Sequence, residues 1–136
     1  MRGIIEVDTE SREELLDITD QVRKIVRESG VTNGLVSLFV QGSTAALMIQ
    51  ENWDDSVPRD VVGFLAGIIP RGVWLHDQQD GNGDAHLKAG MVGPSETIPI
   101  INGKVALGRW QNIFLCEFDG PRSGRSIVCT VLTDGG

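Results

Sequence analysis

The chain has 136 residues, of which 40% are hydrophobic and 23% are charged. This composition is typical of a folded globular protein and excludes a disordered chain, and the length predicts one domain over residues 1–136. The 12 Lys and Arg against 19 Asp and Glu give a net charge of −7. We therefore expect no nucleic-acid partner, because an acidic surface repels the phosphate backbone.

Apolar spacing predicts two helices, both in the first part of the chain. The first covers residues 17–30, where Gly30 suits the left-handed position that follows a helix end. Its apolar side chains recur at the i, i+4, i+7 and i+8 positions of one face, at Ile18, Val22, Ile25 and Val26. The second helix is predicted to begin at Pro58 and to end at Pro70.

The remaining regular structure is predicted to be β, apart from a polar loop at residues 77–84 whose turn residues are too dense for a regular element. The predicted strands cover residues 4–7, 35–41, 45–50, 85–91, 96–101, 105–107, 112–118 and 126–132. These elements predict an α+β fold, a two-layer mixed or antiparallel β-sheet core with two helices. Strands 35–41 and 112–118 are apolar at nearly every position. We expect both to be buried on both faces, in a two-layer packing or a subunit interface.

The cysteines and the first residues of the chain indicate the cellular compartment in which the protein is expected. Cys116 and Cys129 both lie in apolar segments and are expected to be buried free thiols in a reducing compartment. No apolar run approaches the roughly 18 residues that a membrane-spanning helix needs. The first residues also lack the apolar core of a signal peptide. We therefore expect a cytoplasmic protein with no membrane partner.

Two histidines flank the polar loop. A loop that returns on itself would bring the imidazoles of His76 and His86 to one point, near the carboxylates of Asp77, Asp80 and Asp84. Two imidazoles and a carboxylate suit zinc or another divalent ion. Their spacing matches no short metal motif, so two unrelated surface histidines are the alternative. Glu51, at the end of a predicted strand, is a further candidate metal ligand or general base.

The turn Gly42-Ser43-Thr44 joins two predicted strands. A glycine followed by hydroxyl residues lets backbone amides approach a phosphate oxygen closely, although an ordinary glycine turn has the same composition. Cations lie near the polar segments at Lys88, Arg109, Arg122 and Arg125. A guanidinium at position 109 or 122 can hold a phosphate with two hydrogen bonds, and a solvated or ion-paired surface arginine is the alternative.

Several of these segments, taken together and in order, resemble a known family. They are Gln50-Glu51-Asn52, the helix that contains Asp60, Asp84-Ala85-His86-Leu87-Lys88-Ala89, Gly93-Pro94-Ser95, Leu107-Gly108-Arg109-Trp110-Gln111 and Glu117-Phe118-Asp119-Gly120-Pro121-Arg122. Their order and spacing resemble the YjbQ-like family, often described as secondary thiamine-phosphate synthases. The resemblance covers residues 12 to 132.

The resemblance implies an α+β fold with a two-sheet core, a homotrimer and a polar pocket at the subunit edge. His76 and His86 match two family histidines. A third family histidine, in a His-Thr-Thr-Ala or His-Thr-Ser-Ala pattern, is replaced here by glycine in Gly42-Ser43-Thr44-Ala45. If that histidine is a metal ligand or an acid–base group, this chain lacks it.

The implied reaction joins a pyrimidine methyl pyrophosphate to a thiazole phosphate and expels pyrophosphate. Such a transfer needs cations at the leaving group, ligands for a divalent ion and a phosphate seat. The catalytic candidates are Glu51, His86, Lys88 and Arg109. The phosphate candidates are Gly42, Ser43, Thr44 and Arg122. The ligands for zinc or magnesium are His76, His86 and Glu51, with Asp84 a further carboxylate.

Two functions therefore stand side by side. One is a transferase of the thiamine-phosphate-synthase type. The other is a non-catalytic, trimeric protein that binds a metal or an anion. In either case the expected partner is a small phosphorylated molecule. A hydrolase that uses a histidine-bound metal and water is a third, weaker option.

Overall fold

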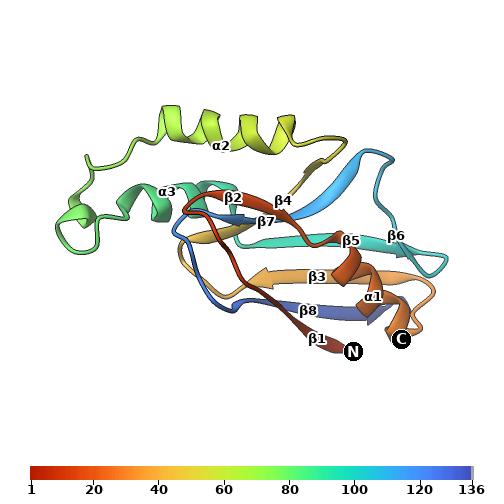
Figure 1. Ribbon diagram of the computed structural model, residues 1–136. Helices are drawn as coiled ribbons and strands as arrows, with labels where there is room; N and C mark the ends of the chain where they lie inside the picture. The colour runs from red at the N-terminus through yellow and green to blue at the C-terminus, as the bar shows by residue number, and fades with distance from the viewer. Residues whose placement is uncertain (136) are drawn as a thin grey trace.

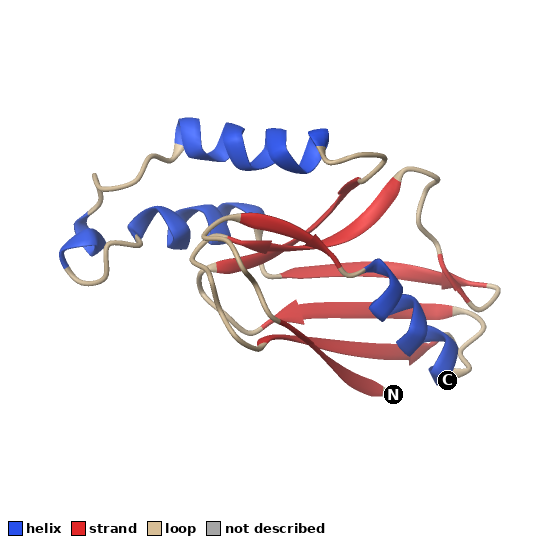
Figure 2. Ribbon diagram, viewed as in Figure 1, coloured by secondary structure: helices blue, strands red, loops and turns tan. Residues whose placement is uncertain are grey.

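The computed structural model describes residues 1–135, which form eight strands in two antiparallel sheets (Figures 1 and 2). The five-stranded sheet has the order β1 (Arg2–Val7), β8 (Arg125–Thr133), β3 (Gly34–Val40), β5 (Ser95–Ile101), β6 (Lys104–Val105). The three-stranded sheet has the order β2 (Glu14–Asp17), β7 (Gln111–Glu117), β4 (Ala45–Glu51). The helices are α1 (Thr19–Ser29), α2 (Ser56–Ile68) and α3 (Gly83–Val92), with a short 3-10 helix, η1 (Leu75–Gln78). The predicted α+β, two-sheet architecture is confirmed.

The main core lies between the two sheets and α1. Val22 and Val26 of α1 pack there against apolar side chains from both sheets, such as Val36, Leu38 and Ile113. A smaller apolar cluster lies on the other face of the three-stranded sheet, beneath α2 and α3. Both faces of that sheet are therefore covered, whereas helices cover only the inner face of the five-stranded sheet (Figure 2).

This layering decides which strands are buried. In β7, Ile113–Glu117 are all buried, as predicted for residues 112–118. The same prediction is wrong for β3, whose side chains alternate between the core and the outside. Leu35 is 44% exposed and Phe39 is 48% exposed. They lie on the outer face of the five-stranded sheet, which nothing in the described residues covers.

The structure corrects the expected strand at residues 85–91, which is helix α3. Ala, Leu, Lys and Met favour a helix, and the segment holds no β-branched residue before Val92. Four buried residues, Asp84, Ala85, Lys88 and Ala89, recur at helical spacing and face the three-stranded sheet. The protein therefore has three α-helices rather than two. The predicted loop at residues 77–84 contains part of η1 and the start of α3.

The cysteines are buried and unpaired, as expected. Burial raises the pKa of Cys116 to about 12 and that of Cys129 to about 11. Both thiols therefore stay protonated near neutral pH, and neither is a reactive nucleophile. None of the helices in residues 1–135 is long and apolar enough to cross a membrane.

Candidate functional site

The loop between α2 and α3 does return on itself. Asp77 accepts hydrogen bonds from the amides of Trp74 (3.0 Å) and Gly83 (2.8 Å), which closes the loop around η1. The ring centroids of His76 and His86 lie 4.7 Å apart, with an angle of 84° between the rings. The two imidazoles therefore meet, although nine residues lie between them in the sequence. His76 Nε2 also lies 3.5 Å from a carboxylate oxygen of Asp80.

The described residues, 1–135, do not bring together a complete set of ligands for a divalent metal. Residues 1–135 contain no group of three or more His, Cys, Asp or Glu side chains arranged to hold a metal ion. Position 42, where the resemblance implies a further histidine, is glycine. Glu51 does not join the histidines, because it ends β4 opposite Gln111 of β7. The residues present thus offer two imidazoles but not the predicted His76, His86 and Glu51 site.

The strand register separates the predicted site residues into two groups. Ala45 pairs with Glu117 at one end of the three-stranded sheet, and Glu51 pairs with Gln111 at the other. Six residues of an extended strand span about 20 Å. The N-terminus of α3 lies at the Glu117 end, because Asn82 donates to Asp119. The histidines and the 42–44 turn lie toward this end, and Glu51 lies at the far end.

Arg109 also belongs to the far end of the sheet. Its guanidinium carbon lies 4.9 Å from the ring centroid of Trp110, next to β7 residue Gln111. The Trp110 ring in turn meets Trp53, with centroids 5.2 Å apart. The predicted catalytic set of Glu51, His86, Lys88 and Arg109 is therefore not gathered at one point.

Lys88 and Asp84 form a buried ion network on α3. Asp84 is 0% exposed and accepts hydrogen bonds from both guanidinium ends of Arg12 (2.9 and 3.1 Å) and from Lys88 (2.9 Å). Lys88 is 1% exposed and also pairs with Glu13. Burial alone would raise the pKa of Asp84, but the bonds from Arg12 and Lys88 outweigh it and hold that pKa below its ordinary value. This network ties α3 to the segment before β2.

A second buried network surrounds Glu117. Its carboxylate is 0% exposed and accepts hydrogen bonds from Thr9 Oγ1 (2.8 Å), the Asp119 amide (3.0 Å), and Arg125 Nε (3.0 Å) and Nη2 (2.5 Å). Burial raises the pKa of Glu117, and these donors, Arg125 first, lower it by more. Sequence reasoning missed Glu117. Its one signal was a carboxylate at the end of an otherwise apolar strand.

The 42–44 turn lies directly against Arg125. Nη2 of this guanidinium donates to the hydroxyl of Thr44 at 2.9 Å. Nη1 has no hydrogen-bond partner in residues 1–135, and a Cβ atom at position 42 would lie only 2.8 Å from it. The amides of Gly42, Ser43 and Thr44 likewise donate no hydrogen bond in the described part of the chain. Arg122 does not join them, since it bonds to Asp119 at 2.8 Å.

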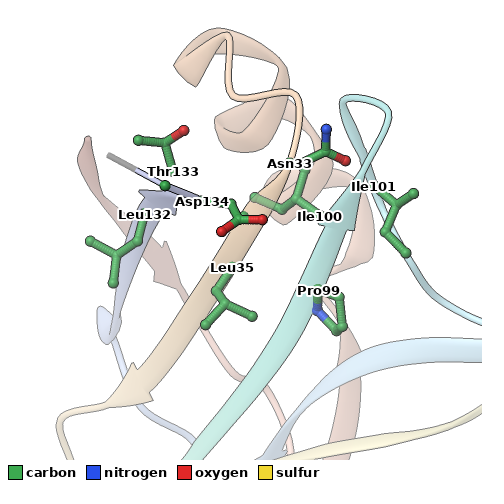
Figure 3. A pocket seen from close by; sticks show the side chains of 10 residues that line it. Asn33, Leu35, Pro99, Ile100, Ile101, Leu132, Thr133 and Asp134 are labelled. Carbon is green, nitrogen blue, oxygen red and sulfur yellow. The ribbon is translucent and has the colours of Figure 1, made fainter.

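A cavity of about 590 Å³ lies elsewhere, on the outer face of the five-stranded sheet (Figure 3). Leu35, Pro99 and Leu132 form its apolar floor, and Asn33 and Asp134 stand at its rim. None of the predicted site residues lines it. The cavity therefore belongs to the uncovered sheet face and not to the polar end near Glu117.

Known proteins are similar to this chain in sequence and in fold. The family described as UPF0047 protein YjbQ-like matches residues 3–134. A UPF0047 protein of Methanocaldococcus jannaschii is 45% identical over 117 residues, which cover 86% of this chain and 84% of the relative. The UPF0047 protein YugU of Bacillus subtilis is 36% identical over 126 residues, which cover 90% of this chain and 93% of the relative.

Solved structures agree with this assignment. A YbjQ-like protein of unknown function from Sulfolobus solfataricus has a TM-score of 0.95 and 40% identity, with 98% of this chain and 97% of that chain covered. A hypothetical protein from Aeropyrum pernix has a TM-score of 0.93 and 35% identity, with 98% and 99% covered. The names of these relatives state no reaction, so they do not support the thiamine-phosphate synthase description. What they do show is that this chain belongs to the YjbQ-like family, UPF0047.

Proposed function

We propose that this protein binds a small phosphorylated molecule without turning it over, with the phosphate held at the 42–44 turn. The observation that carries the proposal is the unpartnered Nη1 of Arg125 facing Gly42, next to three unpartnered backbone amides. Backbone amides and a guanidinium are the donors that proteins use for phosphate oxygens. The side chain of Ser43, which is exposed, adds a hydroxyl at the same turn.

The lack of a side chain at Gly42 leaves room for a phosphate at this site, the phosphate seat formed by the 42–44 turn and Arg125. Any side chain at position 42 would bring its Cβ within 2.8 Å of Arg125 Nη1. That guanidinium is fixed by Glu117 and Thr44, so it has little freedom to retreat. Because Glu117 balances the charge of Arg125, the seat recognises an anion through oriented donors more than through net charge.

Substituting Gly42 with Ala tests this seat. The added methyl group covers Nη1, and we expect the affinity for inorganic phosphate to fall at least about tenfold, as loss of a charge-assisted hydrogen bond implies. Isothermal titration calorimetry measures the change. Gly67→Ala on α2 is the matched control, since nothing lies within 4 Å of a Cβ there. Unchanged phosphate binding by Gly42→Ala would reject the seat.

The transferase reaction is the other candidate, and the geometry supports it less. Lys88 is ion-paired inside the molecule, and Glu51 and Arg109 lie at the far end of the sheet. Incubating the protein with the pyrimidine methyl pyrophosphate and the thiazole phosphate separates the two functions. Our proposal expects binding of the thiazole phosphate with no thiamine phosphate formed. Turnover that depends on His86 would establish the transferase instead.

The expected homotrimer belongs to the same proposal. Apolar side chains on the outer face of the five-stranded sheet, among them Leu35, Phe39 and Leu132, are half-exposed, and an apolar surface of this kind favours association. Light scattering should give a mass three times the 14.7 kDa of one chain. Phe39→Asp should shift the mass to that of one chain. Phe64→Asp, an exposed phenylalanine on α2, should not. A trimer that survives Phe39→Asp would place the interface elsewhere.

A further inference from the structure

We propose a second small-molecule site, independent of the 42–44 turn, in a cavity between α1 and the β5–β6 turn. The cavity measures about 320 Å³, and its lining residues are Arg23, Val26, Arg27, Gly103, Lys104 and Val105. A neighbouring cavity of about 400 Å³ shares Val26, Arg27 and Gly103 with it. The two therefore form one groove, the α1–β6 groove, with Arg27 where they join.

The floor of the α1–β6 groove is apolar. Val26 of α1 is 1% exposed and Val105 of β6 is 9% exposed, so both side chains belong to the main core and present only their outer atoms to the groove. The two valines come from different elements. Each is held by core packing, so the floor is preformed before any ligand arrives.

The rim of the groove is basic. Arg27 and Lys104 form no ion pair within residues 1–135, and the one carboxylate near Arg23 is that of Asp20 at 3.9 Å, which is almost fully exposed. Elsewhere in the molecule Arg12, Lys88, Arg122 and Arg125 are all paired closely with carboxylates. In a chain of net charge −7, Arg27 and Lys104 thus give the α1–β6 groove two cations with no ion-pair partner in the described residues.

A basic rim over an apolar floor fits a small organic anion. The anionic head would pair with Arg27 and Lys104, and a guanidinium binds carboxylate or phosphate with two parallel hydrogen bonds. A ring or short alkyl chain attached to that head would cover the two valines and remove their outer atoms from water. The volume is at the lower end of small-molecule sites, which suits a body of one ring.

The probe is phenyl phosphate, titrated into the ¹⁵N-labelled protein and followed by amide chemical shifts. We expect shifts at residues 26, 27, 103 and 104, and binding at least about tenfold tighter than that of inorganic phosphate or phenol at the same residues. Benzoate distinguishes the head group. If benzoate binds as tightly as phenyl phosphate, the site accepts any anionic head group. If benzoate binds more weakly, the site prefers phosphate. Both results support a ligand site in the groove. Equal binding of inorganic phosphate and phenyl phosphate at these residues would overturn the proposal.

Substitutions test the basic rim directly. Arg27→Gln and Lys104→Gln should each weaken phenyl phosphate binding about tenfold, because each removes a charge-assisted hydrogen bond. Arg71→Gln is the matched control, an exposed arginine outside the groove. Equal weakening by Arg71→Gln would show only diffuse attraction and would reject the site. Thermal unfolding checks that each variant is folded. Gly42→Ala should leave binding in the groove unchanged, so this proposal and the phosphate seat fail separately.

Discussion

Replacing Asp84 with Ala should lower the free energy of unfolding by about 3–5 kcal/mol. The substitution removes the fully buried one of the two carboxylates that bond both Arg12 and Lys88. Lys88 is almost fully buried and would keep only Glu13 as a partner. An uncompensated charge in the interior costs several kcal/mol, whereas the same loss at the surface costs little. Urea unfolding of the variant and the unaltered chain measures the difference.

An exposed ion pair supplies the matched control. Arg59 and Asp55 pair on α2 at 3.3 Å with both side chains largely exposed, so Asp55→Ala should change the free energy of unfolding by less than about 1 kcal/mol. An equally small effect of Asp84→Ala would contradict our account. It would show that Lys88 can dispense with Asp84, which would restore Lys88 as a candidate for chemistry.

Acid sensitivity provides a second readout of the same network. The pKa of Asp84 is lowered from the ordinary value of 3.8, so the carboxylate binds its proton more weakly in the folded chain than in the unfolded one. The stability that this shift contributes is present above the unfolded pKa and is lost as the pH falls through the folded pKa. Asp84→Ala should remove this part of the acid unfolding below about pH 4.

Replacing Glu117 with Gln should cost a similar amount, about 3–5 kcal/mol. The carboxylate accepts four hydrogen bonds at a fully buried position, and it balances the charge of Arg125. The Gln side chain has the same shape but only one acceptor oxygen. Its NH2 group would face the N–H and O–H groups that now donate to the carboxylate. Thermal and urea unfolding test the loss, with Glu28→Gln on the surface of α1 as the control.

Phosphate gives this variant a signature that simple destabilisation lacks. Without Glu117 the charge of Arg125 is unbalanced, so an anion at the 42–44 turn would replace the lost carboxylate. Added phosphate should therefore raise the melting temperature of Glu117→Gln by more than that of the unaltered chain. An equal or smaller increase would show that Arg125 does not face the bound anion.

The meeting of His76 and His86 was predictable because it rests on local chemistry. The segment between them is rich in Asp, Asn and Gly, which close turns through their own side chains and backbone. Asp77 does this by accepting the Gly83 amide six residues on. Spacing in the sequence could not place Glu51 with respect to the histidines. Its position depends on the strand register, which puts Glu51 about 20 Å along the sheet from the end that holds Glu117.

Helix α3 was predicted as a strand because its sequence lacks a clear apolar helical pattern. Its buried positions 84, 85, 88 and 89 lie on one face of the helix, but they do not form an apolar stripe, because two of them are the charged residues Asp84 and Lys88. A buried Asp84 and Lys88 disguise the inner face, because charged residues normally mark the outside. Their spacing of four residues was the available signal, since i, i+4 pairs of opposite charge stabilise helices.

The amino-acid sequence by itself determined the helices at 19–29 and 56–68, most of the strands and the closed loop between the histidines. These features depend on periodic apolar spacing and on turn residues, which act over a few positions of chain. Tertiary structure alone decided the long-range partners of the buried charges. Arg12 meets Asp84 across 72 positions, and Arg125 meets Thr44 across 81. Such pairs depend on how the two sheets pack, and the spacing of residues over a few positions of the sequence does not predict that packing.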